Sequence, residues 1–271
     1  MRRTYAQGEP ATEELSVPGL PIPIRIKRHP RARRMTLRVS QCRKGVVLTL
    51  PRACKSREAH SFITKNIRWI KQHLNALPEE VAFTNGAVIP VRGTPHELAF
   101  VGRTSGRGVV WLSPRQEAVD RFFEDAAPVR ATQDFSSSTN HDMCKLNIAG
   151  DEKHAPRRLQ DWLIKQARQD LTDRVAFHAD RLGLTPKRIT VRDQSSRWGS
   201  CSTTGALSFS WRLVLAPPDV LDYVAAHEVA HLREMNHSDR FWALVRQTMP
   251  EMDAAKSWLR QNGAHLHAYG N

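Results

Sequence analysis

The motif H-E-V-A-H, residues 227–231, constrains this chain more than any other feature. The preceding residues 219–226 are mostly apolar, so we expect the motif to lie on a helix. Residues i and i+4 of a helix share one face, which would point the imidazoles of His227 and His231 the same way. Two neutral imidazoles placed in this way can share one zinc ion, at about 2.0–2.1 Å each. The Glu228 side chain would point about 100° around the helix and flank the metal.

Two residues compete for the position of third ligand. His237 follows His231 by six positions, and Asn236, which tolerates the left-handed conformation, offers a place for the helix to end. If the helix continued, Glu234 would share its face with His231, either as a third ligand or as a hydrogen-bond partner of an imidazole. We favour His237, because Glu234 would stand roughly one helical turn past the ion. Three protein ligands and one open position are typical of a catalytic zinc site.

These residue types predict hydrolysis by an activated water. Zinc lowers the pKa of water to about 7 and polarises a carbonyl group. Glu228 would act as the general base and pass the proton to the leaving amine, an effect worth about 10²–10⁴-fold. An all-imidazole site also accepts manganese, cobalt or nickel, although zinc suits three histidines well.

The net charge indicates an anionic partner or a solvated basic surface. Hydrophobic and charged contents of 40% and 25% are ordinary for a globular protein, whereas a net charge of +14 and a pI near 10.3 are not. Such a balance favours nucleic acid, nucleotides, anionic membrane surfaces or acidic ligands. The four cysteines form no C-x-x-C pair, and the N-terminus lacks an apolar signal region, so we expect a reduced cytoplasmic protein. No apolar run approaches the ~20 residues of a membrane-spanning helix.

Periodicity divides the chain into four parts. Residues 1–20 are aperiodic and are predicted to form a loose N-terminal arm. Residues 21–113 are predicted to form a β-rich part with one helix, whose N-cap would be Ser56. Residues 114–155 lose periodicity, apart from a possible short helix, and read as a polar insertion or linker. Residues 156–271 are predicted to form the catalytic domain.

Within that last part, a long helix is predicted from Pro156 to a stop at Gly183. Strands are expected at residues 189–191 and 207–215, ahead of the metal helix. Ser238 is a plausible cap for a further helix that ends near Pro250.

The stretch R-W-G-S-C, residues 197–201, leads into those strands. Because a strand ahead of the metal helix can bind an extended substrate by strand addition, we expect this stretch to border the cleft. Arg197 is the candidate substrate-binding residue, for a carboxylate, a phosphate or a developing oxyanion. Trp198 and Cys201 are interpreted as packed inside a structural turn. Nothing in the sequence supports Cys201 as a nucleophile, because no base that could activate it is identifiable.

Several of these motifs together resemble the YgjP-like family of predicted zinc metallopeptidases. The resemblance is carried by residues 196–201, 224–232, 236–238 and 241–242, and residues 35–51 and 62–69 resemble the N-terminal part of that family. It implies a small zincin related to the SprT-like proteases. It also implies His227, His231 and His237 as ligands and Glu228 as the catalytic residue. Residues 114–155 look like an insertion beyond the usual pattern.

We therefore expect an α+β fold, with a small zincin-type catalytic domain whose β-sheet precedes the metal helix, plus an N-terminal β-rich part. The expected function is that of a zinc-dependent metallopeptidase acting on peptides or proteins. One alternative is a metal-dependent phosphohydrolase acting on nucleotides, because the same activated water can attack phosphorus. Another is a DNA-associated protein or protease with zinc at the same site. The basic surface suits both alternatives.

Overall fold

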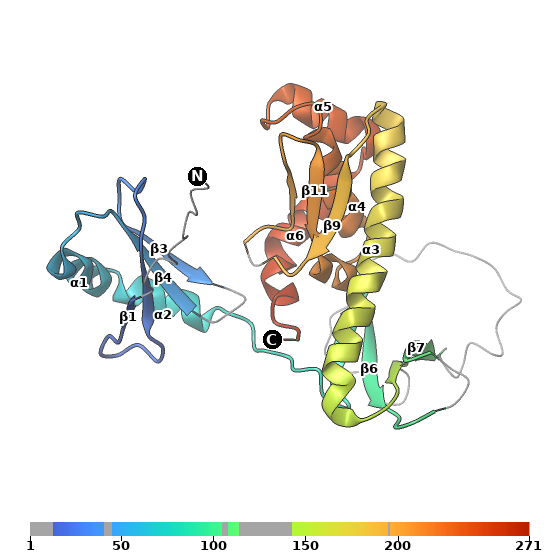
Figure 1. The fold of residues 1–271 in the computed structure, drawn as a ribbon, viewed down its shortest axis with the longest axis horizontal. Helices are drawn as coiled ribbons and strands as arrows, with labels where there is room; N and C mark the ends of the chain where they lie inside the picture. The colour runs from blue at the N-terminus through green and yellow to red at the C-terminus, as the bar shows by residue number, and fades with distance from the viewer. Residues whose placement is uncertain (1–12, 41–44, 105–107, 114–142, 195, 271) are drawn as a thin grey trace, which may run out of the picture. The chain divides into compact units, whose positions relative to one another are not determined.

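A computed structural model describes residues 13–40, 45–104, 108–113, 143–194 and 196–270 (Figure 1). Within these ranges the protein is a mixed α+β structure with three small sheets and six α-helices. The α+β prediction is confirmed at this level. The chain divides into two compact units, one ending at Glu79 and the other spanning Glu80–Gly270. No helix of the described part is both long and apolar enough to span a membrane.

A four-stranded sheet forms one layer of the first unit. It contains β1 (Glu13–Leu15), β2 (Ile24–Arg28), β3 (Thr36–Ser40) and β4 (Gly45–Leu50), in the order β1-β2-β4-β3. β2 and β4 are parallel, and the other pairs are antiparallel. β1 lies within the stretch predicted to be a loose arm. Its Leu15 stands opposite Ile24, and Val17 just beyond it is buried, so apolar burial orders this part of the arm. Residues 1–12 lie outside the described ranges.

The single helix predicted for this unit is two helices, α1 (Ser56–Lys65) and α2 (Ile67–Asn75). They separate at Asn66, whose side-chain nitrogen donates to the carbonyl of Phe62 at 2.8 Å. The cap is Lys55 rather than Ser56, and its backbone N–H donates to the Glu58 carboxylate at 3.0 Å. Both helices cover one face of the sheet, where Ile63 and Ile70 are fully buried with the inward-facing strand residues.

The second unit begins with another four-stranded sheet, in the order β5-β6-β8-β7. Its strands are β5 (Val88–Val91), β6 (Thr94–Phe100), β7 (Val110–Ser113) and β8 (Cys144–Ile148). β8 lies within the predicted insertion and pairs with both β6 and β7, so this part of the insertion belongs to the sheet. The boundary between the two units falls between Glu79 and Glu80, whereas the sequence placed a linker at residues 114–155. Residues 114–142 lie outside the described ranges, including the possible short helix there.

The long helix α3 (Ala155–Leu182) follows a short 3₁₀ turn, Glu152–His154, and confirms its prediction. It ends at Gly183, which has φ +61°, a left-handed conformation that costs glycine little. One stripe of α3 is fully buried in the core of the unit: Leu159, Leu163, Ala167, Leu171 and Val175.

A three-stranded sheet precedes the helix that carries the H-E-V-A-H motif, as predicted. It contains β9 (Arg188–Arg192), β10 (Gly199–Cys201) and β11 (Ala206–Ser210), in the order β10-β11-β9, so β10 is an edge strand. β9 and β11 are parallel, and β10 and β11 are antiparallel. The predicted strand over residues 207–215 stops at Ser210, because Trp211–Leu215 form a 3₁₀ helix. The buried Arg212 within it forms an ion pair with Asp193 at 3.1 Å.

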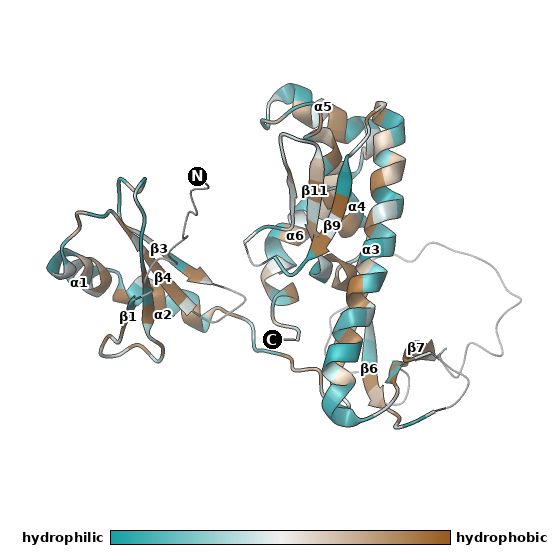
Figure 2. Ribbon diagram, in the orientation of Figure 1, coloured by the Kyte–Doolittle hydropathy of each residue, from teal (hydrophilic) through white to brown (hydrophobic). Residues whose placement is uncertain are grey.

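Three helices complete the second unit: α4 (Pro218–Ala230), α5 (Asp239–Thr248) and α6 (Met252–Leu266). α4 is buried over most of its length, with Val220, Val224, Ala225 and Val229 almost inaccessible. It packs against α3, α5 and α6, and Figure 2 shows its mainly hydrophobic composition. A helix that is apolar on nearly all sides is held rigidly by its neighbours. The two histidines of the motif lie at the end of this helix.

Candidate metal centre

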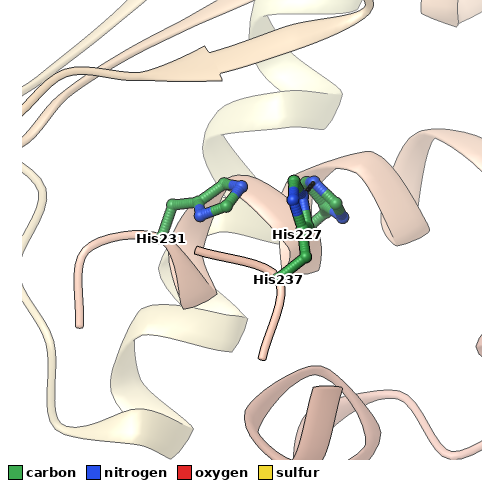
Figure 3. A group of neighbouring side chains, drawn as sticks. All are labelled: His227, His231 and His237. Carbon is green, nitrogen blue, oxygen red and sulfur yellow. Dashed lines mark hydrogen bonds between the residues drawn. The ribbon is translucent and has the colours of Figure 1, made fainter. Parts of the chain in front are cut away.

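His227 and His231 leave α4 at its C-terminal end (Figure 3). His231 is the C-cap residue, with φ −64° and ψ −17°, so the helical spacing of the two residues is kept. Their ring centroids are 4.9 Å apart. The sequence predicted that this helix would end at Asn236, but α4 ends at Ala230, with His231 as its C-cap.

The early end of α4 brings His237 back toward the helix. Asn236 lies in the connecting loop, where its side-chain oxygen accepts from the backbone N–H of Ser238 at 3.1 Å. Ser238 is the N-cap position of α5, as predicted. The Nε2 atom of His237 consequently lies 3.1 Å from Nε2 of His227.

The three imidazoles form a group that could hold a metal ion. Their ligand atoms all lie within 4.8 Å of one another. Two nitrogens bound tetrahedrally at about 2.05 Å lie about 3.3 Å apart, close to the observed Nε2–Nε2 distance between His227 and His237. Because burial lowers the pKa of His227 to about 3, this ring is neutral and offers a lone pair. Burial also lowers the pKa of His231, against the opposing effect of its bond to the Glu234 backbone.

Glu234 meets the site through its backbone. Its carbonyl oxygen accepts from Nδ1 of His231 at 2.9 Å, which fixes the proton on Nδ1 and leaves Nε2 free to bind a cation. Its carboxylate is not part of the cluster of potential ligands. The buried Nδ1 of His227, in contrast, has no hydrogen-bond partner in the described structure.

Aromatic side chains from α5 surround the three imidazoles. The Phe241 ring lies 4.8, 4.5 and 4.8 Å from the rings of His227, His231 and His237, and it is fully buried. Trp242 stacks on His237 at 5.7 Å. An apolar lining of this kind lowers the local dielectric and strengthens charge interactions with a bound ion.

Glu228 is buried beneath strand β10. It is only 5% exposed, and its side chain packs against Gly199. Burial raises the pKa of the Glu228 carboxyl to about 7, and the positive charge of Arg197 opposes that rise. A carboxyl with a pKa near neutral is well matched to taking up and releasing a proton at physiological pH.

In the 197–201 stretch, Arg197 is exposed, whereas Trp198 and Cys201 are partly buried. Arg197 lines a groove of ≈ 580 Å³ on the outer face of the β9–β11 sheet. Trp198 stacks on His267 at 4.5 Å, and Trp198 and Cys201 both pack against the core, as interpreted from the sequence. Burial, followed by the charge of Glu228, raises the pKa of the Cys201 thiol and keeps it protonated.

Two neighbours of the cluster were not singled out from the sequence. Tyr223 lies one turn before His227 on α4, and burial, followed by the charges of Glu228 and Asp253, raises its pKa to about 12. Its i−4 spacing from His227 is the signal that could have identified it. Gly199 is the other, since a glycine inside a strand often marks a close approach.

The fold and these side chains define a class, a mixed α+β protein with a candidate three-histidine metal centre. The model of the YgjP-like family, metallopeptidase domain, matches residues 33–262, so the chain belongs to that family. No curated protein matches the sequence. Among solved structures, the chain is similar to the metallopeptidase zymogen abylysin from Pyrococcus abyssi, at 22% identity and a TM-score of 0.31. That match covers 34% of this chain and 92% of abylysin.

Proposed function

We propose that this protein is a zinc-dependent metallopeptidase of zincin type, with catalysis in the part of the second unit that follows β8. His227, His231 and His237 would hold the zinc, and Glu228 would be the general base. The observation that carries the proposal is the burial of the Glu228 carboxyl one residue from His227, with its pKa raised to about 7. The family of the chain supports the peptidase activity.

In the proposed mechanism, Glu228 transfers the proton and Arg197 orients the substrate. When bound, zinc supplies Lewis acidity, which polarises a peptide carbonyl and makes water more acidic. Glu228 takes a proton from the attacking water, whose oxygen forms a bond to the carbonyl carbon. As the C–N bond breaks, Glu228 returns that proton to the leaving amine nitrogen. Arg197, whose charge reaches Glu228, orients an anionic group of the substrate or the developing oxyanion.

An extended peptide would pair with strand β10. β10 is the edge of its sheet, and among the described residues no strand pairs with its outer side. Addition of a substrate strand there runs the peptide past Gly199, directly above Glu228. A nearby hollow of ≈ 490 Å³ would take one substrate side chain, with Trp198, Tyr223 and Leu259 as its apolar wall.

The test compares metal-loaded wild type with Glu228→Gln on unfolded proteins and short peptides. The variant keeps the size of the side chain but removes its base, so metal content should be unchanged while peptide hydrolysis falls by about 10²–10⁴-fold. Chelation should abolish hydrolysis by the wild type. Undiminished turnover by Glu228→Gln would refute the assignment.

A second function is favoured by a specific feature, the cationic groove beside Arg197. Arg188, Arg192 and Arg197 line it together with several hydroxyl side chains. The planar guanidinium group of arginine binds two phosphate oxygens at once. This groove and the three-histidine centre together would therefore suit a metal-dependent phosphohydrolase acting on nucleotides. Phosphate release from nucleoside triphosphates, lost in Glu228→Gln, would favour this function over peptide hydrolysis. DNA binding that survives Glu228→Gln, without any hydrolysis, would favour the DNA-associated alternative.

A further inference from the structure

The face of the β1–β4 sheet opposite α1 and α2, together with the turn after β2, carries a dense cluster of basic residues. Seven of the fourteen residues from Arg25 to Arg38 are Arg or Lys, and none is acidic. Six of the seven are arginine, the residue whose planar fork matches phosphate oxygens. Alternation along a strand sends every second side chain to the same face, so the position of each cation follows from the register.

The register gathers three of these cations on one face of the sheet. Ile24 and Ile26 of β2 are buried under the helices, so Arg25 and Lys27 point to the opposite face, where both are exposed. Arg38 of β3 and Arg25 both stand beside Val47 of the central strand β4. With strands about 4.8 Å apart, Arg25 and Arg38 lie about 10 Å from each other on that face.

Neutral side chains separate these cations. Lys27 stands opposite Thr49, which in turn stands opposite Thr36. In the described part of this face the acidic residue is Glu14 of the edge strand β1, opposite Arg25. Hydroxyl groups between guanidinium and ammonium groups add further donors to an oxyanion.

The turn between β2 and β3 extends the cluster beyond the sheet. Arg31, Arg33 and Arg34 are exposed there, and the turn is held by the backbone N–H of Ala32, which donates to the carbonyl of His29 at 3.1 Å. Arg28 is different, because its guanidinium donates to the carbonyl of Cys54 at 2.7 Å and so stabilises the unit itself.

We propose that this surface, formed by Arg25, Lys27 and Arg38 with the 31–34 turn, binds the phosphate backbone of a nucleic-acid duplex. Among its described residues the face offers no large apolar anchor of the kind that dominates protein–protein interfaces. The described aromatic residues of the unit, Phe62 and Trp69, lie on the helices behind it, so no platform for stacking single-stranded bases is present on the sheet. Phosphate contacts remain as the source of affinity, which makes binding independent of sequence.

The proposal concerns the first unit and does not depend on the metal centre. With the whole chain of 271 residues, binding of a labelled DNA duplex of about 20 base pairs is measured by fluorescence anisotropy over about 50–200 mM salt. The triple variant Arg25→Glu, Lys27→Glu, Arg38→Glu should weaken binding by at least about tenfold. It should also reduce the slope of log K against log salt by about 0.9 for each phosphate that the variant no longer neutralises.

A matched variant separates this face from charge in general. Arg57→Glu, Lys65→Glu, Arg68→Glu makes the same change in charge on exposed positions of α1 and α2, and it should alter affinity by less than about threefold. Glu228→Gln should bind the duplex as the wild type does. Thermal unfolding of both triple variants checks that the unit remains folded.

Three results would overturn the proposal. In the first, the two triple variants weaken duplex binding equally. In the second, polyglutamate at equal charge displaces the duplex as well as unlabelled DNA does, which would indicate an acidic protein partner. In the third, vesicles containing anionic lipid bind more tightly than the duplex, which would indicate a membrane surface.

Discussion

The backbone of Gly199 lies closer to the Glu228 side chain than any other residue type at position 199 could, because every other residue carries a Cβ. A Cβ built on Gly199 would lie 2.5 Å from both Cγ and Oε1 of Glu228. The edge strand β10 therefore holds the proposed base in place from above, while α4 holds it from below. Since a displacement of about 1 Å can cost roughly 100-fold in rate, this contact has a direct consequence for catalysis.

Gly199→Ala should lower the rate of hydrolysis by about 100-fold with little loss of metal, because the added methyl group displaces Glu228 and leaves the three imidazoles alone. Hydrolysis kinetics and metal analysis of the purified variant check this. Ser200→Ala, the next position of β10, is the control and should remain close to wild type. Equal activity of Gly199→Ala and wild type would show that the position of Glu228 does not limit the reaction.

His237→Ala and Glu234→Ala should differ sharply in zinc affinity. His237 offers an imidazole to the cluster, whereas Glu234 contributes a backbone carbonyl that an alanine would keep. Loss of a ligand should weaken zinc binding by more than about 100-fold, beyond the effect of losing a hydrogen-bond partner of a ligand. Competition against a chromophoric chelator measures both. Stoichiometric zinc in the His237 variant alone would reverse the assignment of the two residues.

The sequence predicted most reliably those features that depend on local spacing. Pro156 and Gly183 marked the ends of α3 to within one residue, because a proline suits the first turn of a helix and a glycine suits its end. The pairing of His227 with His231 followed in the same way from helical geometry. Neither feature needs information about distant parts of the chain.

Features that depend on distant contacts were missed or left open. The choice between Glu234 and His237 turned on where α4 ends, and the helix ends at Ala230, six residues before Asn236. Leu213 and its neighbours read as a strand, yet they form a buried 3₁₀ helix. Propensity is a weak guide wherever packing decides.

Zinc should raise the thermal stability of the protein, because the three imidazoles come from the end of α4 and from the loop that leads to α5. A ligand at about 1,000 times its Kd stabilises the folded state by about 4 kcal/mol. Differential scanning calorimetry with zinc and with a chelator measures the change in Tm. His227→Ala should show no such difference between the two conditions. A similar zinc-dependent rise in that variant would place the stabilising metal elsewhere.

The ion pairs between α3 and α4 should make stability fall in acid. Asp222 accepts from Arg174 at 2.5 Å and lies 2.7 Å from Nε2 of the buried His178. Burial alone would raise the pKa of Asp222, but its bonds to His178 and Arg174 outweigh burial and lower it. Because the folded-state pKa is depressed, the stabilisation is complete above the unfolded-state value of about 3.9 and disappears as the pH falls through the folded-state pKa.

Asp222→Asn should therefore reduce the free energy of unfolding by about 2 kcal/mol at pH 7, where the wild-type carboxylate is charged. The difference in the free energy of unfolding between the two proteins should shrink below about pH 4, because the wild-type Asp222 is then protonated and neutral, like the asparagine amide. Urea unfolding across this pH range gives both quantities. Asp161→Asn is the control, because that carboxylate is exposed and lies 3.8 Å from Arg157, an arrangement worth little. A pH-independent difference would mean that Asp222 stabilises the helix pair through packing and neutral hydrogen bonds.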